Sequence, residues 1–106
     1  MRIASLYQQG RHFTAWPLRV TYAPIEDDCT QVLVWAPKKL FRHAIQRNRL
    51  RRQMREAYRL NKQLLTTPYH LAFYYIDKTP QSYQTIERAM QKALAKIQSA
   101  QRHEPT

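Results

Sequence analysis

Basic side chains are concentrated in one short segment, between Lys38 and Lys62. This segment holds ten lysines and arginines, and Glu56 is its only acid, so it carries +9 of the formal net charge of +11. The ten are Lys38, Lys39, Arg42, Arg47, Arg49, Arg51, Arg52, Arg55, Arg59 and Lys62. Charge focused on one element indicates a docking surface for a polyanion, because a solvated helix normally mixes both signs.

The chemistry of these side chains favours RNA as the polyanion. Seven of the ten are arginines, whose planar guanidinium groups hold phosphate oxygens bidentately and stack on bases, whereas lysine offers a compact point charge. Asn48 lies among them and supplies both a donor and an acceptor, which suits a 2′-hydroxyl or a base edge. Nucleic acid, and RNA in particular, is therefore the expected partner class.

A long helix is predicted to position these groups, because residues 42–65 contain neither Pro nor Gly. Apolar side chains recur through it at helical spacing, namely Leu50, Met54, Ala57, Leu64 and Leu65. At about 100° per residue, Asn48, Arg52, Arg55 and Arg59 fall within a narrow arc opposite that apolar stripe. One face of the helix is expected to pack and the other to bind.

Nothing in the sequence predicts an active site or cofactor site carried by the protein itself. The histidines are widely scattered and show no metal-ligand spacing with Cys or Asp; they are His12, His43, His70 and His103. Cys29 is the only cysteine, which excludes an intramolecular disulfide and favours a structural role. Gly10 is the only glycine, which excludes glycine-rich phosphate loops. No metal and no small-molecule substrate is expected on the protein alone.

The remaining elements are predicted from periodicity and turn residues. Residues 1–9 favour a short helix, which Gly10 closes. Residues 18–22 alternate between apolar and polar side chains, as a half-buried strand does, and 32–36 and 69–76 indicate two further strands. An N-cap at Ser82 precedes a last helix, whose apolar stripe comprises Ile86, Met90, Ala93, Leu94 and Ile97.

This order of elements predicts a small α/β (α+β) two-layer sandwich, with a mixed sheet, a long basic helix and a C-terminal helix. The chain is too short to cover both sheet faces, so one face is expected to be exposed. Residues 1–101 form a single domain in this interpretation, and 102–106 a loose tail. No apolar run approaches the roughly 18 residues of a spanning helix, and the N-terminus lacks the apolar stretch of a secretory signal. A cytoplasmic protein is expected.

The basic segment closely resembles the signature of the bacterial ribonuclease P protein. In that family a KK pair leads into a helix that reads RNR, a basic pair and RE; here Lys38 and Lys39 are followed by residues 47–56. Ile3, Tyr7 and Gly10 are also similar to the family pattern of two aromatics four apart and a glycine. The resemblance covers nearly the whole chain.

The resemblance implies an accessory subunit of a ribonucleoprotein endonuclease, in which the RNA subunit cleaves the 5′ leader from precursor tRNA with Mg²⁺ held mainly by RNA. It implies RNA contacts by Lys38, Lys39, Arg47, Asn48, Arg49, Arg51, Arg52 and Arg55, and Arg59 is added to this set from its place on the basic arc of the helix. It also implies a cleft for the single-stranded leader, with Ile3, Tyr7 and Tyr22 as candidates. Tyr and Ile in an apolar stripe are more often core residues, so this last assignment stays open.

Three alternatives share some of these features. A non-enzymatic RNA-binding protein, such as a ribosome-associated factor, would carry the same basic helix without affecting tRNA processing. A DNA-binding regulator would place the helix in a major groove, but the short turn and second recognition helix of that motif are lacking. A membrane-surface role would need a large apolar face opposite the charge, and the core is expected to use that face.

Overall fold

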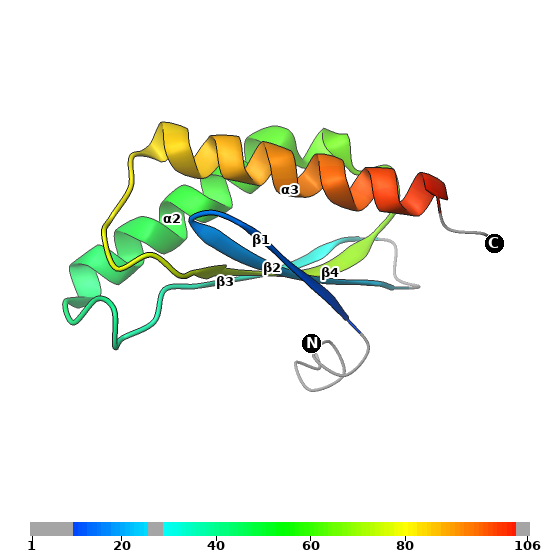
Figure 1. The fold of residues 1–106 in the computed structure, drawn as a ribbon. Helices are drawn as coiled ribbons and strands as arrows, with labels where there is room; N and C mark the ends of the chain where they lie inside the picture. The colour runs from blue at the N-terminus through cyan, green and yellow to red at the C-terminus, as the bar shows by residue number, and fades with distance from the viewer. Residues whose placement is uncertain (1–9, 26–28, 104–106) are drawn as a thin grey trace.

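The computed structural model describes residues 10–25 and 29–103, which form one sheet and two long helices (Figure 1). In chain order the elements are β1 (Arg11–Ala15), β2 (Leu18–Pro24), β3 (Gln31–Trp35), α2 (Ala44–Asn61), the 3₁₀ turn η1 (Lys62–Leu64), β4 (Tyr69–Tyr75) and α3 (Tyr83–His103). The predicted helix at residues 1–9 lies outside the described residues.

The sheet has four strands in the order β1-β2-β4-β3. β1 pairs with β2 and β2 with β4 in antiparallel fashion, whereas β3 pairs with β4 in parallel. α2 and α3 pack side by side on one face of this sheet (Figure 1). The predicted two-layer sandwich with a mixed sheet is confirmed.

Strand alternation divides the sheet residues between two faces. Leu18, Val20 and Tyr22 of β2 are buried on the face that the helices cover. Arg19 and Thr21 alternate with them and therefore lie on the opposite face. No helix of the described chain covers that opposite face (Figure 1).

The core lies between the sheet and the helices and contains the predicted apolar stripes. α2 contributes Leu50, Met54 and Ala57. The stripe predicted for α3 is fully or almost fully buried, and its members are Ile86, Met90, Ala93, Leu94 and Ile97. The N-cap prediction is also confirmed, because the Thr85 backbone N–H donates to Ser82 Oγ at 3.2 Å.

A buried asparagine joins the two helices where α2 ends. Asn61 Nδ2 donates to the Ala57 carbonyl at 2.8 Å, and Gln91 Nε2 of α3 donates to Asn61 Oδ1 at 3.2 Å. A buried amide has to satisfy its donors and acceptors within the protein. These bonds therefore fix the position of α2 against α3, and so the direction of the basic face of α2.

The main differences from the prediction concern three elements. β1 was not predicted, because an edge strand reading RHFTA lacks a clear apolar alternation. The long helix spans 44–61 rather than 42–65, and Leu64 in the following 3₁₀ turn is 37% exposed, because the tighter turn breaks the 100° spacing. α3 continues to His103, into the segment predicted as a tail from 102, since no Pro or Gly interrupts it before Pro105.

Candidate nucleic-acid interface

The exposed face of α2 carries a shallow groove of about 340 Å³, which we call the arginine groove. Its lining residues are Asn48, Arg51, Arg52, Arg55, Glu56 and Arg59. They recur three and four positions apart, so a straight helix places them on one side. The structure thus brings together five of the nine residues that the sequence analysis assigned to RNA.

Hydrogen bonds within the arginine groove order several of its side chains. Arg59 Nε donates to Glu56 Oε2 at 3.2 Å, and Arg59 Nη2 donates to Glu56 Oε1. The bond from Arg59 lowers the pKa of Glu56, which therefore stays ionised and offsets one positive charge. Arg51 Nη2 donates to Asn48 Oδ1. Arg52 and Arg55 are exposed between these two pairs and present their charge to solvent.

The other predicted RNA contacts lie outside the arginine groove. Lys38, Lys39 and Arg49 are exposed. Arg47 is half-buried, and its Nη1 donates to the Phe41 carbonyl at 2.9 Å and to the Arg42 carbonyl at 2.9 Å. Arg47 is therefore directed toward the chain that leads into α2 and does not share the exposed face.

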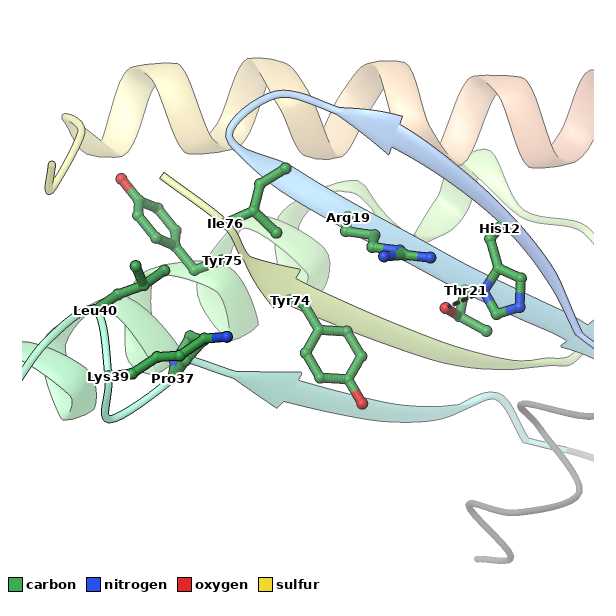
Figure 2. Close-up of a pocket in the computed structure, with 9 residues that line it drawn as sticks. All are labelled: His12, Arg19, Thr21, Pro37, Lys39, Leu40, Tyr74, Tyr75 and Ile76. Carbon is green, nitrogen blue, oxygen red and sulfur yellow. Dashed lines mark hydrogen bonds between the residues drawn. The ribbon is translucent and has the colours of Figure 1, made fainter. Parts of the chain in front are cut away.

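A second and larger hollow, of about 690 Å³, lies on the sheet face opposite the helices (Figure 2). We call it the sheet pocket; its lining residues are His12, Arg19, Thr21, Pro37, Lys39, Leu40, Tyr74, Tyr75 and Ile76. They come from β1, β2, β4 and the segments after β3 and β4. The His12 Nδ1 and Thr21 Oγ1 atoms are 2.8 Å apart and hydrogen-bonded. Neither this pocket nor most of its lining was predicted.

Strand register places a cation and two aromatic rings in a row across this face. Tyr74 of β4 pairs with Arg19 of β2 on one side and with Trp35 of β3 on the other. Trp35 is 46% exposed, which is high for so large an apolar side chain. A row of Arg, Tyr and Trp offers guanidinium and aromatic planes on which unpaired bases stack.

Tyr22, a predicted leader-cleft residue, lies in the core instead. Its ring is 8% exposed and makes edge-to-face contacts with Phe13 at 5.8 Å and Tyr69 at 6.0 Å. Strand alternation turns it toward the helices, away from Arg19 and Thr21. Ile3 and Tyr7, the other two candidates, lie outside the described residues.

The sequence carried a signal for two of the residues that line the sheet pocket, although not for the pocket itself. Arg19 and Thr21 occupy the polar positions of an alternating strand, so they had to face away from the core. Tyr74 lies in the apolar run 69–76, and only the observed alternation separates it from the buried Phe73 and Tyr75. The run itself does not say which of its aromatic residues face outward.

Comparisons with known proteins decide the family to which this interface belongs. The family model described as Ribonuclease P matches residues 1–98. The chain belongs to the ribonuclease P protein family. A ribonuclease P protein component from Porphyromonas gingivalis is 38% identical over 105 residues, covering 90% of this chain and 77% of that protein. The component from Chlorobium phaeobacteroides is 41% identical over 71 residues, covering 61% of this chain and 49% of that protein.

Solved structures of ribonuclease P proteins share the fold. The RNase P protein from Thermotoga maritima superposes with a TM-score of 0.80 at 18% identity, covering 90% of each chain. The protein from Staphylococcus aureus gives a TM-score of 0.76 at 18% identity, covering 90% of this chain and 86% of that one. At these identities the likeness supports the α+β fold alone.

Membership of the ribonuclease P protein family gives the chain its role. It is the protein component of ribonuclease P, an accessory subunit of a tRNA-processing ribonucleoprotein endoribonuclease, and its partner is ribonuclease P RNA. This favours the main interpretation over a ribosome-associated RNA-binding protein. Within the described residues, no helix combines the length and apolar character needed to span a membrane.

Proposed function

We propose that this ribonuclease P protein, acting in the cytoplasm, holds the catalytic RNA on the arginine groove and the single-stranded 5′ leader of precursor tRNA in the sheet pocket. The observation that carries the proposal is the presence of two separate hollows of different chemistry, one lined by polar and mostly cationic side chains and one that combines cations with aromatic rings. The RNA subunit performs the cleavage, and the protein contributes binding energy and orientation.

The arginine groove suits a folded RNA backbone. Arg51, Arg52 and Arg55 present planar guanidinium groups along one helix face, and such groups match the geometry of phosphate oxygens. Each phosphate that they neutralise releases counterions, so binding should weaken steeply with salt. Exposed Lys38, Lys39 and Arg49 extend the cationic surface beyond the groove.

The sheet pocket suits a strand whose bases are unpaired. Tyr74 in the pocket and the neighbouring Trp35 of β3 supply aromatic surface, and Arg19 of β2 supplies a cation for the RNA backbone. Stacking tolerates any base, because every base has an aromatic face. A leader of variable sequence can therefore be held without reading its bases individually.

The two hollows are linked by the segment that connects β3 to α2. Lys39 lines the sheet pocket, and five residues later α2 begins at Ala44. Lys38 beside it is exposed. A leader that leaves the sheet pocket past these lysines is thus directed toward the RNA bound along α2.

We place the Mg²⁺ of the reaction on the RNA subunit. The described residues contain no group of three or more His, Cys, Asp or Glu side chains that could hold a metal ion. When bound to RNA, Mg²⁺ lowers the pKa of the attacking water and stabilises the leaving oxygen. The side chains of this chain act by binding and orienting the two RNAs.

Cleavage of a precursor tRNA by the cognate ribonuclease P RNA at low Mg²⁺, with and without the protein, tests the proposal. We expect protein-dependent 5′ maturation, and a larger stimulation for precursors that carry a leader several nucleotides long. Tight binding to the catalytic RNA without any stimulation would contradict the proposed role in processing. Stimulation that is independent of leader length would contradict only the assignment of the sheet pocket.

A further inference from the structure

Arg47 differs from every arginine of the arginine groove in where its guanidinium lies. It is half-buried, and both hydrogens of Nη1 are directed to main-chain carbonyls, those of Phe41 and Arg42, each at 2.9 Å. Arg47 precedes Leu50 by three residues and Met54 by seven, so helical geometry turns it toward the flank of α2 that packs on the core. Its position favours an intramolecular role.

The segment that Arg47 holds forms a wall of the sheet pocket. Pro37 and Leu40 line the pocket, and the Leu40 and Phe41 amides both donate to the Pro37 carbonyl, at 3.2 and 3.1 Å. The buried Phe41 ring packs edge-to-face on Tyr75 with 5.4 Å between ring centroids. A turn of this kind sets the distance between the lysine-bearing segment and β4, and so the width of the pocket.

The start of α2 lacks the usual means of fixing such a segment. His43 at the N-cap position makes no side-chain capping bond, although N-cap side chains normally accept from the first free amides. The Gln46 and Arg47 amides donate to the His43 carbonyl, and the Arg47 side chain adds two bonds to the residues before it. The Arg47 side chain therefore ties the 37–42 segment to the helix.

We infer that Arg47 is a positioning residue, which couples the RNA-binding helix to the wall of the sheet pocket instead of contacting RNA phosphate. Because its two acceptors are carbonyls of residues 41 and 42, RNA docking that orients α2 also fixes the pocket wall through Arg47. The effect of Arg47 on leader binding rests on the proposed function, in which the sheet pocket holds the leader. The structural part of the inference stands on the free protein alone.

Amide hydrogen exchange in the free protein tests the structural part. In Arg47→Met, which keeps an unbranched side chain but removes the charge and the donors, exchange of the Leu40 and Phe41 amides should accelerate about tenfold, the effect of losing bonds from a charged donor. Arg49→Met, which removes the same charge from an exposed neighbour, should leave these two amides unchanged. Equal exchange in wild type and Arg47→Met would overturn the inference.

RNA binding supplies the second readout. Arg49→Met should lower the log-log salt dependence of binding to ribonuclease P RNA by about 0.9, the contribution of one phosphate contact, whereas Arg47→Met should leave it unchanged. Arg47→Met should instead reduce the ratio of affinities for precursor tRNA with and without a leader. If the salt dependence falls equally in both variants, Arg47 is a phosphate contact and the inference fails.

These outcomes separate the inference from the proposed function. If wild-type protein does not favour leader-bearing precursor, the assignment of the sheet pocket fails, while the exchange result still decides whether Arg47 fixes the segment. Circular dichroism establishes that the variants fold. If Arg47→Met does not fold, Arg47→Gln and Arg49→Gln provide the same comparison with shorter neutral side chains.

Discussion

Replacing Arg52 and Arg55 together by glutamine should weaken binding to ribonuclease P RNA and flatten its dependence on salt. Both residues line the arginine groove, are exposed, and lie between the ordered pairs Asn48–Arg51 and Glu56–Arg59. If each holds one phosphate of a duplex, the double variant loses about 1.8 from the magnitude of the log-log slope. The change keeps side-chain polarity and touches no core residue.

The size of the change in slope follows from the number of phosphates that the two arginines contact. When the salt concentration is raised from about 50 to 200 mM, the affinity for RNA falls in both proteins. Because the slope of the double variant is smaller by about 1.8, its affinity should fall by a factor roughly tenfold smaller than the wild-type affinity does. Fluorescence anisotropy or filter binding across this range measures it. Arg88→Gln with Lys92→Gln is the matched control, because it removes two exposed charges from α3.

The control distinguishes a docked surface from general attraction. The account requires the α3 variant to keep nearly the wild-type slope, because those charges lie outside the arginine groove. Equal flattening in the α2 and α3 variants would refute the reasoning, since it would mean that RNA senses net charge rather than a defined set of contacts.

Three further predictions concern the sheet pocket and the core. Tyr74→Ala should weaken the binding free energy for leader-bearing precursor by about 1–3 kcal/mol, the contribution of one base stacked on an aromatic ring. The affinity for a leaderless tRNA should not change, and competition binding with both RNAs measures the difference. Asn61→Ala should lower the free energy of unfolding by about 1–3 kcal/mol, because Gln91 and the Ala57 carbonyl lose their partner, and urea titration measures this. Burial raises the pKa of Tyr75, so the unfolded chain releases this proton first and stability should fall as pH rises from about 10 toward the folded-state pKa. Urea midpoints between about pH 9 and 11 should show a smaller decline in Tyr75→Phe than in wild type.

The amphipathic helices and the fold class could be predicted from the sequence because hydrophobic periodicity is a local property. The stripe of α3 from Ile86 to Ile97 and the basic arc of α2 both follow from a period of 3.6 residues. The same periodicity locates the arginine groove, since groove residues need only share one helix face. Four of its six lining residues, Asn48, Arg52, Arg55 and Arg59, could therefore be named without knowing the sheet.

The sheet pocket could not be predicted, because it depends on pairing between distant strands. His12 and Thr21 meet through the β1–β2 register, and Arg19, Tyr74 and Trp35 form a row only because β4 lies between β2 and β3. Sequence alternation separates the faces of one strand but does not say which strands are neighbours. Tyr22 shows the complementary error, since the family resemblance suggested a place in the leader cleft and the alternation of β2 places its side chain in the core.

Arg47 shows a limit of assigning roles from a sequence motif. It stands in the RNR run with Asn48 and Arg49, and the family resemblance gives all three the same function. Their directions differ by about 100° per residue along the helix. The side of the helix on which Arg47 lies, together with its bonds to the Phe41 and Arg42 carbonyls, distinguishes its proposed intramolecular role from the RNA contacts proposed for its neighbours.

The most direct test of the account is the affinity of the complex between this protein and its catalytic RNA for precursor tRNAs whose leaders increase by single nucleotides. The account predicts that affinity rises over the first few nucleotides and then reaches a plateau once the sheet pocket is filled, and that Arg19→Gln with Tyr74→Ala abolishes the rise. An affinity that does not depend on leader length in the wild-type complex would contradict it.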